Sequence, residues 1–218
     1  RKIYQLCREN GVYLMIDEAY SDFMVQGFPS LAKIAPSKDG AIIINSLSKN
    51  FGISGWRIGY MICNKVLREQ IIKFNQHLIT CAPTILCMYV EKYFDMMIPA
   101  AKKEINKLLN KRLKIENYMD KIGLKYLSGS ATFYYFISIK GFIGSDVDFS
   151  NLLLTKHNIS VVPGSAYGKS TSKFIRISIG AEPPSRIFKA LQCIKSLIKI
   201  NRIDKEKLSK DLSQWQYQ

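Results

Sequence analysis

The sequence predicts an α/β protein with a mostly parallel sheet in its first part and a smaller α+β domain in its second part. Two observations lead to this fold class. Before Pro99, nearly continuous apolar runs alternate with amphipathic stretches, which is typical of layered folds with buried parallel strands. After Pro99, a strand with alternating polarity favours a half-exposed antiparallel sheet. We therefore predict a larger domain over residues 1–98 and a smaller domain over residues 99–218.

The larger domain is predicted to alternate helices and strands. An amphipathic segment that stops at Gly11 predicts the first helix. Residues 12–17 (VYLMID) and 41–46 (AIIINS) are apolar runs typical of buried parallel strands, and residues 56–63 (WRIGYMIC) are a third strand candidate. The segment KVLREQIIKFNQHLI then predicts a helix, and Pro83 opens another helix that begins TILCMYVEKYF.

The smaller domain is predicted to begin with a long charged helix over about residues 100–122. The half-exposed strand ATFYYFISI follows, then a helix near residues 147–157, the short strands ISVVP and FIRISI, and a helix introduced by Pro183-Pro184. In that last helix apolar residues recur at steps of three and four, namely Ile187, Leu191, Ile194 and Ile198. A polar tail is expected after about residue 202.

The net charge of +15 raises the question of a nucleic-acid or anionic-membrane partner. In the densest basic segment, apolar side chains recur at helical spacing: Ile105, Leu108, Ile115, Met119 and Ile122. The lysines fall largely off that stripe, as on a solvated helix face: Lys103, Lys107, Lys111 and Lys114. No apolar run approaches the roughly 20 residues that span a bilayer. We therefore expect a soluble protein without a nucleic-acid or membrane partner.

The cysteines and histidines favour neither a disulfide framework nor a metal site. The five cysteines are odd in number and show no C-x-x-C spacing. His77 and His157 lie far apart in the chain without a cluster of carboxylates, and we expect each of them at the surface or at a helix end. These features predict a reducing, cytoplasmic setting and no bound metal.

The segment INSLSKNFGISGWRIGY, residues 44–60, carries the residues with the clearest chemistry. A desolvated or cation-flanked lysine amine can condense with a carbonyl to form a Schiff base, and Lys49 follows an apolar strand. Arg57 could form a bidentate pair with a phosphate, and Ser46 and Ser48 offer hydroxyls to the same anion. The alternative is a strand, a glycine-rich loop and a second strand without special chemistry.

The segment IDEAY places a carboxylate where open α/β sheets bind ligands. Asp17 closes the predicted strand 12–17. Its carboxylate could face the pyridine nitrogen of a bound cofactor and keep that nitrogen protonated. An opposite charge nearby typically shifts a pKa by about 1–3 units. Tyr20, three residues later, could donate a hydrogen bond from its hydroxyl to the phenolic oxygen of the same cofactor ring. The alternative is an acidic helix start, since acids are common in a first helical turn.

Together these segments resemble the fold-type-I pyridoxal-phosphate (PLP)-dependent aminotransferases of classes I and II. IDEAY is similar to that family's D-E-x-Y segment, and SLSKNFGISGWRIGY to its S-x-S-K-x-x-x-x-x-G-x-R-x-G segment. SVVPGSAYG and FIRISIG resemble later family segments in the same order. The resemblance implies a PLP-dependent transferase-like fold. Residues 1–98 would form the C-terminal part of the large PLP-binding domain, and residues 99–218 the small C-terminal domain.

Carried over residue by residue, the resemblance implies three catalytic residues. Lys49 would form the Schiff base with PLP and later move the proton between the substrate Cα and the cofactor C4′. Asp17 would pair with the pyridinium nitrogen, which keeps the ring an electron sink. Tyr20 would contact the phenolic oxygen of the cofactor.

The resemblance also implies a set of anion-binding residues. Ser46 and Arg57 would hold the cofactor phosphate, with Ser48 as a weaker candidate. Arg176, in FIRISIG, would clamp the substrate α-carboxylate. Without the family, Arg176 could equally be a solvent-facing strand residue, because strand faces alternate.

The implied function is the transfer of an amino group between an α-amino acid and a 2-oxo acid by a ping-pong cycle, with a homodimer expected for the full-length protein. Two alternatives share these motifs. One is another PLP enzyme of the same fold, such as a decarboxylase, a β-lyase or a synthase. The other is a catalytically inactive or regulatory PLP-binding domain, although such regulators usually carry a fused DNA-binding segment.

Several family features are expected upstream of the D-E-x-Y segment, and only 16 residues precede Asp17 here. These features are a glycine-containing turn at a helix N-terminus that holds the phosphate, an aromatic ring that stacks on the cofactor, an asparagine at the phenolic oxygen and a dimerisation arm. We therefore expect the chain to be a fragment that is inactive alone and binds PLP weakly. Uncovered apolar strand faces are expected to drive self-association.

Overall fold

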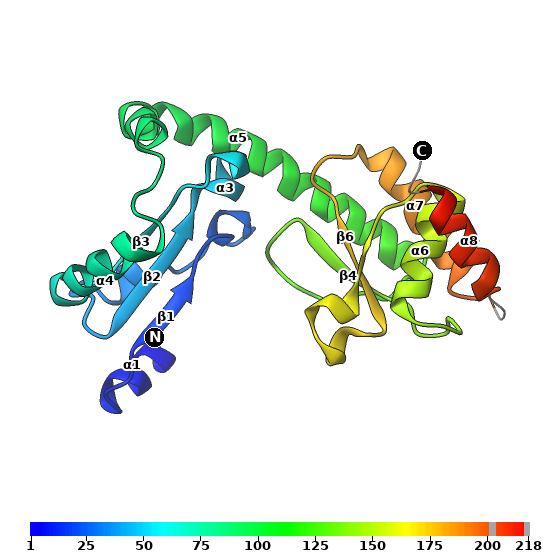
Figure 1. Cartoon of the computed structure of the whole chain (residues 1–218), viewed down its shortest axis with the longest axis horizontal. Coiled ribbons are helices and arrows are strands. Elements are labelled where there is room, and N and C mark those ends of the chain that lie inside the picture. Colours follow the sequence, from blue (N-terminus) through cyan, green and yellow to red (C-terminus); the bar gives the residue numbers. More distant parts are fainter. Residues whose placement is uncertain (201–203, 216–218) are drawn as a thin grey trace. The chain divides into compact units, whose positions relative to one another are not determined.

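The computed structural model describes residues 1–200 and 204–215, which fall into two compact units. Unit 1 comprises Arg1–Lys107 and unit 2 comprises Leu108–Gln218, and Figure 1 labels the elements of each. The division lies inside one long helix, whereas the sequence predicts a domain boundary between residues 98 and 99. The separate roles of the two predicted domains stay a prediction.

Unit 1 is built on a three-stranded sheet in the order β1-β2-β3. β1 (Leu14–Asp17) and β2 (Ala41–Ser46) are parallel, as the sequence predicts, while β3 (Gly59–Ile62) is antiparallel to β2. β3 is shorter than the predicted strand 56–63. Arg57 has a left-handed backbone conformation with φ 58°, so strand pairing begins only after it.

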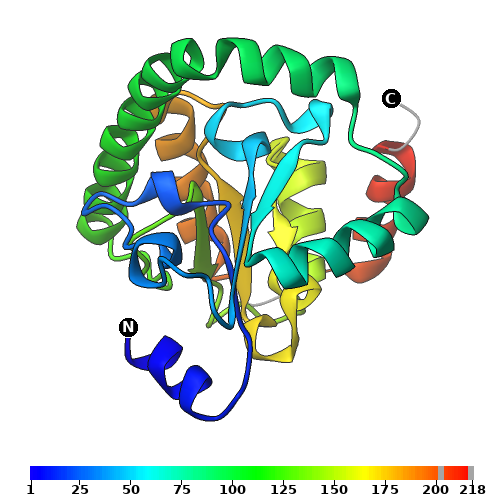
Figure 2. The ribbon, with the colours of Figure 1, turned by 90° about the vertical axis from the view of Figure 1, so that its left-hand side faces the viewer.

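The remaining elements of unit 1 are helical. They are α1 (Lys2–Glu9), η1 (Ser21–Phe23), α2 (Leu31–Ile34), α3 (Leu47–Asn50), η2 (Ser54–Trp56), α4 (Lys65–Leu78) and α5 (Thr84–Lys121), the last of which continues into unit 2. Figures 1 and 2 show α1 at one end of the sheet and α3 at the other end, where β1 and β2 finish. Gly11, at φ 65°, allows the chain to turn out of α1 as predicted.

Unit 1 has two small hydrophobic clusters rather than one continuous core. The first joins α1 and α2 to one face of the sheet: Tyr4, Leu31, Ala35, Ala41 and Ile43. The second joins the segment after β2 to the start of α5: Leu47, Ile58 and Val90, flanked by Phe51, Ile53, Trp56, Leu86 and Cys87. The second cluster packs the segment of α3, the helix that carries Lys49, against the first turns of α5.

Unit 1 also exposes many large apolar side chains. No side chain of α4 is buried, and Val66, Phe74 and Leu78 are 73%, 66% and 67% exposed. Met15 in β1 and Met61 in β3 are exposed as well. Apolar surface of this extent usually seeks a partner. The self-association expected from the sequence stays a prediction.

α5 runs unbroken from Thr84 to Lys121 with Pro99 inside it. The sequence predicts two helices that meet at Pro99, and this prediction is wrong. Pro99 lacks the N–H that would bond the carbonyl of Asp95, a loss that costs about 3 kcal/mol in a helix interior. Both residues are exposed, so water can satisfy that carbonyl. Buried Val90 and Ile105 anchor the helix on either side of the proline.

Unit 2 contains a second three-stranded sheet, in the order β4-β6-β5. β4 (Tyr134–Ser138) and β5 (Val162–Pro163) are both antiparallel to β6 (Phe174–Ser178). The other elements are α6 (Asp146–His157), η3 (Gly164–Tyr167), η4 (Lys169–Thr171), α7 (Pro184–Leu197) and α8 (Lys205–Trp215). The predicted strands ATFYYFISI and FIRISI and the helices near 147–157 and after Pro183 are confirmed, whereas only the last two residues of ISVVP form a strand. The predicted polar tail contains a helix, α8.

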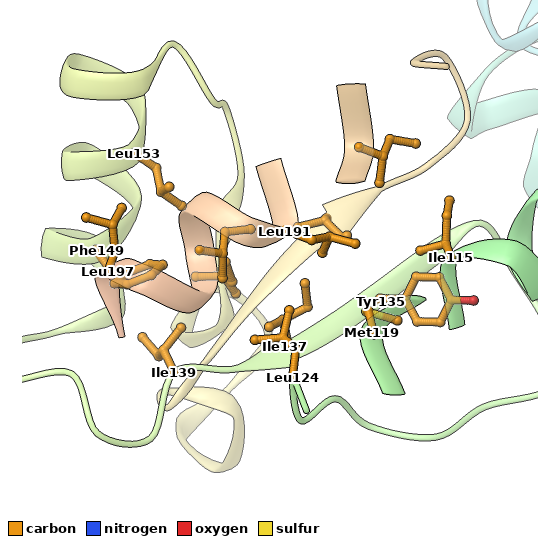
Figure 3. Close-up of a cluster of buried hydrophobic side chains, with 14 of the residues drawn as sticks. Ile115, Met119, Leu124, Tyr135, Ile137, Ile139, Phe149, Leu153, Leu191 and Leu197 are labelled. Atoms are coloured by element: carbon orange, nitrogen blue, oxygen red, sulfur yellow. The ribbon is translucent and has the colours of Figure 1, made fainter. Parts of the chain in front are cut away.

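The buried face of this second sheet forms the largest core among the described residues (Figure 3). In Figure 3, side chains from α5, α6 and α7 converge on β4: Ile115, Met119, Phe149, Leu153, Leu191 and Leu197 surround Tyr135, Ile137 and Ile139. The predicted apolar stripe of α7 is confirmed at Ile187, Leu191 and Ile194, while Ile198 is only partly buried. The alternation in β4 and β6 leaves the opposite face of the sheet open.

The basic face of α5 is solvated only in part. Lys103, Lys107 and Lys114 are exposed as predicted. Lys111, by contrast, donates from its Nζ to the carbonyl oxygens of Gly180 and Glu182, each at 2.9 Å. Burial lowers the pKa of Lys111, and the charge of Glu182 opposes that shift. Lys111 therefore joins α5 to the segment that precedes α7.

α8 packs against α6, which the sequence did not predict. Leu208 of α8 is buried, and Lys156 Nζ lies 2.5 Å from Asp211 Oδ2. His157 ends α6 and His77 lies in the last turn of α4, as expected from the sequence. Within the described residues, no helix combines the length and the apolar character that a bilayer crossing requires.

Candidate active site

Three segments of unit 1 meet at one edge of its sheet. Because β1 and β2 are parallel, their carboxyl ends, Asp17 and Ser46, lie at the same edge. β3 runs in the opposite direction, so its first residue, Gly59, also lies there and pairs with Ser46. Lys49 follows β2 directly, and Arg57 directly precedes β3. The fold therefore brings the IDEAY segment and both ends of the lysine segment to an edge of the kind where open α/β sheets bind ligands.

Asp17 and Ser46 also share one face of the sheet. Asp17 pairs with Ile44 of β2, and side chains of paired residues point to the same side. Ser46 is two residues beyond Ile44 on the same strand, so it points to that side too. Ile43, which belongs to the cluster under α1 and α2, points to the opposite side. Asp17 and Ser46 thus lie on the face of the sheet away from that cluster.

The turn after β1 begins at Asp17 and carries Tyr20. Asp17 Oδ1 accepts a hydrogen bond from the backbone N–H of Ala19 at 2.9 Å. Within the described part of the chain, no lysine or arginine lies at ion-pair distance from the Asp17 carboxylate. The ring of Tyr20 lies 5.9 Å from that of buried Phe23, which helps to orient it. The Asp17 carboxylate is therefore exposed and has capacity for a further partner.

Glu18 anchors the same turn to unit 1. Its side chain is 5% exposed, and its Oε1 accepts from Leu31 N at 2.8 Å and from Ser30 Oγ at 3.1 Å. These donors lie at the start of α2. The alternative interpretation of IDEAY as an acidic helix start is therefore correct only in part. Glu18 does not begin a helix itself, but it accepts hydrogen bonds at the start of α2, further along the chain.

Replacing Glu18 with alanine is expected to lower the free energy of unfolding by about 1–3 kcal/mol, because the buried N–H of Leu31 would lose its acceptor. Urea unfolding followed by the fluorescence of Trp56, in the same unit, would measure the change. Glu18→Gln keeps one acceptor oxygen and should cost less. Exposed Glu69 provides the matched control, and Glu69→Ala should change stability by less than about 0.5 kcal/mol. Equal stability of Glu18→Ala and the wild type would contradict the anchoring role.

Ser46 and Lys49 are held by the short helix α3. Ser46 Oγ accepts from Ser48 N at 3.2 Å and so caps the helix, while its hydroxyl proton is still able to bond a ligand. Lys49 is half-buried. Among residues 1–200 and 204–215, no carboxylate lies at ion-pair distance from its Nζ. The amine of Lys49 is therefore not held by a counter-charge of the protein.

The backbone is strained at Arg57 and leaves no room for a side chain at Gly59. Arg57 has φ 58° and ψ 41°, a left-handed conformation that costs a non-glycine residue about 1–2 kcal/mol. Its Nη1 donates to Ser54 O at 2.7 Å. A side-chain carbon at Gly59 would lie 2.8 Å from the carbonyl oxygen of Asn45, so only glycine lets β3 approach β2 this closely. Strain of the kind seen at Arg57 gathers at functional sites.

One hydrogen bond ties the lysine segment to the IDEAY segment. Asn50 Nδ2 donates to Asp22 Oδ2 at 3.0 Å across 28 residues of sequence. Burial raises the pKa of Tyr60 in β3, and the carboxylates of Asp22 and Glu18 raise it further. The turn after β1, helix α3 and strand β3 therefore form one local structure.

The side chains at this edge fit PLP by chemical type. Lys49 supplies an amine for an aldehyde, and Asp17 supplies a carboxylate for a pyridinium. Ser46 and Arg57 supply a hydroxyl and a guanidinium for a phosphate. Within the described residues these groups do not form ion pairs with one another, so each is able to bind a ligand. No group of three His, Cys, Asp or Glu side chains in that part of the chain is placed to hold a metal ion.

Arg176 belongs to unit 2 and lies in the middle of β6. It pairs with Phe136 of β4 and Val162 of β5, on the open face of that sheet. Its Cζ lies 4.2 Å from the ring centroid of Tyr134 and 4.7 Å from that of Tyr167. The sequence left open whether Arg176 is a solvent-facing strand residue. In the structure it is half-buried and lies against two aromatic rings.

The sequence did not indicate the residues that support these side chains. Glu18, Asp22 and Asn50 were polar residues within or next to recognised segments, but no spacing shows which of them meet. Tyr134 and Tyr167 lay in segments predicted as a strand and a loop. Their common contact with Arg176 depends on the pairing of β4 with β6, which no local pattern reveals.

Comparisons with known proteins agree on one family. Residues 1–194 match a family model described as aminotransferase class I and II. A (5-formylfuran-3-yl)methyl phosphate transaminase of Methanocaldococcus jannaschii is 30% identical over 204 residues, which are 91% of this chain and 53% of that protein. An aspartate aminotransferase of Thermotoga maritima is 27% identical over 201 residues, which are 90% of this chain and 50% of that protein.

Solved structures lead to the same family. The aromatic aminotransferase of Pyrococcus horikoshii OT3 superposes with a TM-score of 0.79 at 25% identity, over 95% of this chain and 55% of that one. A Methanococcus jannaschii protein, described as similar in its active site to kynurenine aminotransferases, has a TM-score of 0.78 at 28% identity, over 91% of this chain and 53% of its own. The chain spans about half the length of the curated relatives it matches.

Proposed function

The chain belongs to the class I and II aminotransferases, and we propose that it acts in the transfer of an amino group between an α-amino acid and a 2-oxo acid, with PLP as cofactor. The observation that carries this proposal is the gathering of Asp17, Ser46, Lys49 and Arg57 at one edge of the unit 1 sheet. A cofactor with an aldehyde, a basic ring nitrogen and a phosphate would engage all four side chains.

PLP, when bound, supplies a reactive aldehyde carbon and an electron-withdrawing ring. Lys49 is the proposed attachment point, and its amine, once released, would take the proton from the substrate Cα and deliver it to the cofactor C4′. The carboxylate of Asp17 holds a proton on the ring nitrogen through its negative charge. The hydroxyl of Tyr20 is assigned to the phenolic oxygen. These three residues form the proposed catalytic set.

The remaining residues bind anions. Ser46 donates its hydroxyl proton and Arg57 its free guanidinium N–H groups to the cofactor phosphate, and Ser48 is a weaker candidate for the same role. Arg176 of unit 2 is assigned to the substrate α-carboxylate, which a guanidinium binds through two parallel N–H groups.

Three further assignments belong to the same proposal. Residues 1–98 are part of the large PLP-binding domain, and residues 99–218 form the small domain. The full-length protein is a homodimer, for which the exposed apolar side chains of unit 1 offer an association surface. The protein is cytoplasmic, and its five free cysteines suit a reducing compartment.

A half-reaction tests the proposed transfer directly. Protein expressed from the complete coding sequence is loaded with PLP and given single amino acids without a 2-oxo acid. We expect one equivalent of 2-oxo acid and one of pyridoxamine phosphate per active site, both measured by mass spectrometry, and reversal when a 2-oxo acid is added. Release of carbon dioxide or ammonia without pyridoxamine phosphate would contradict amino-group transfer and indicate a decarboxylase or a β-lyase.

A further inference from the structure

Two tyrosines form an aromatic cage around Arg176 on the open face of the unit 2 sheet. We define this aromatic cage as the rings of Tyr134, in β4, and Tyr167, in η3, whose centroids lie 4.2 Å and 4.7 Å from Arg176 Cζ. Phe136 and Arg176 are paired across β4 and β6, and Tyr134 is two residues before Phe136. All three therefore point to the face away from the core. Tyr167 reaches Arg176 from the loop that follows β5.

The Tyr167 side of the aromatic cage is packed in place. Phe136 contacts the ring of Tyr167 in an edge-on arrangement, with centroids 5.3 Å apart and planes at 82°. The turn that carries Tyr167 begins at Gly164, where a side-chain carbon would lie 2.0 Å from the carbonyl oxygen of Thr171. Only glycine allows this loop to close so tightly. Tyr167, although 46% exposed, is thus carried by a tightly closed loop and contacts a neighbouring ring.

The Tyr134 side is held from α5. Arg112, which is only 3% exposed, donates from its Nη1 to Thr132 O at 3.0 Å and reaches Tyr134 O at 3.5 Å. Its Nη2 donates to Glu116 Oε1 at 3.0 Å, which balances the buried charge. A buried arginine bound to the backbone at the start of β4 leaves little freedom in the position of Tyr134.

The guanidinium of Arg176 lies against two aromatic rings and, in the described part of the chain, has no acidic partner. Within the described residues, no carboxylate lies at ion-pair distance from Arg176. Each ring attracts the cation that lies over its face. A guanidinium binds a carboxylate through two parallel hydrogen bonds from N–H groups in its own plane.

We propose that Tyr134 and Tyr167 are positioning residues that hold the Arg176 guanidinium ready for a carboxylate; this rests on the proposed assignment of Arg176 to the substrate α-carboxylate. A free arginine side chain has several rotatable bonds, and fixing them on binding weakens affinity. The aromatic cage restricts the movement of the guanidinium before the ligand arrives. The rings, rather than the hydroxyl groups, carry this role.

The test uses arginine side-chain NMR of the 218-residue chain, labelled with ¹⁵N-arginine, with sodium acetate as the carboxylate probe. The Arg176 signal is identified by its loss in Arg176→Lys. We expect its side-chain protons upfield of those of the exposed arginines, because two rings lie against it. We also expect acetate to shift this signal saturably, while sodium chloride at the same ionic strength does not.

Ring-removing and ring-keeping variants separate positioning from general stability. Tyr134→Leu and Tyr167→Leu should each move the Arg176 protons downfield and weaken acetate binding by about two- to fivefold, the size of one exposed cation–π contact. Tyr134→Phe and Tyr167→Phe keep the rings and should retain both the upfield shift and the acetate affinity. Exposed Tyr13, in unit 1, offers a matched control, and Tyr13→Leu should change neither.

Two results would overturn the inference. Leucine variants that keep the wild-type shift and affinity would show that the rings do not position Arg176. Phenylalanine variants that lose the upfield shift and the acetate affinity would show that the hydroxyl groups, not the rings, position Arg176. Failure of the proposed function looks different: Arg176 would keep its upfield position in the wild type and respond to the ring variants, but acetate would not shift it. That outcome would show that Arg176 does not bind a carboxylate, and the inference would be overturned together with the proposed assignment.

Discussion

Replacing Lys49 with alanine is expected to abolish covalent attachment of PLP and to lower the rate of amino-group transfer by about 10²–10⁴-fold or more, the contribution of a well-placed proton-transfer group. Alanine has the highest helix propensity, so α3 and the cluster formed by Leu47, Ile58 and Val90 should persist. The defect would then be chemical rather than structural. Protein from the complete coding sequence, loaded with PLP and reduced with borohydride, should yield a pyridoxyl group on the peptide that contains Lys49.

The matched control for this experiment is Lys65, an exposed lysine of the same unit. Its side chain is 80% exposed and lies 4.0 Å from Glu69, so Lys65→Ala should leave both attachment and rate unchanged. Peptide mapping decides the assignment. A pyridoxyl group on any other lysine of the wild-type protein would show that Lys49 is not the attachment point.

Replacing Asp17 with asparagine is expected to lower the rate by about 10- to 1000-fold. An opposite charge shifts the pKa of its partner by about 1–3 units, and each unit is a factor of ten in the protonated fraction. Asparagine keeps the Oδ1 acceptor for the N–H of Ala19, so the turn after β1 should retain its shape. Only the negative charge is lost. Steady-state rates of amino-group transfer would measure the effect.

The pH dependence separates loss of charge from a structural defect. Without the Asp17 carboxylate, the partner nitrogen has a lower pKa and is protonated only in more acidic solution. The rate defect of Asp17→Asn should therefore shrink as the pH falls. Asp39, an exposed carboxylate of the same unit, provides the control, and Asp39→Asn should behave as wild type at every pH. A near-normal rate for Asp17→Asn at neutral pH would refute the assigned role.

Much of the fold could be predicted from local patterns. The apolar runs at 12–17 and 41–46 became β1 and β2, and the alternation in ATFYYFISI became β4 with one buried face. Strands and helices of this kind follow from side-chain period and from punctuation by glycine and proline. The continuity of α5 could not be predicted, because packing on both sides of Pro99 and exposure of the freed carbonyl offset the local cost of proline.

The candidate site divides in the same way. Lys49, Asp17, Ser46 and Arg57 were recognisable because each stands at a fixed offset within a short segment. Their meeting at one edge depends on the parallel pairing of β1 with β2 and on the antiparallel return of β3. The first pairing follows from buried apolar strands, whereas the second had no local signal.

By itself, then, the sequence determined the family, the order of most elements and the candidate site residues, since these depend on residues near one another in the chain. Only the tertiary structure decided which residues hold these side chains in place. Glu18 accepts a hydrogen bond at the start of α2, Asn50 donates one to Asp22, and two tyrosine rings contact Arg176. Such contacts join residues far apart in the chain. They are set by strand register and by the closure of loops, and no periodicity or motif spacing encodes either one.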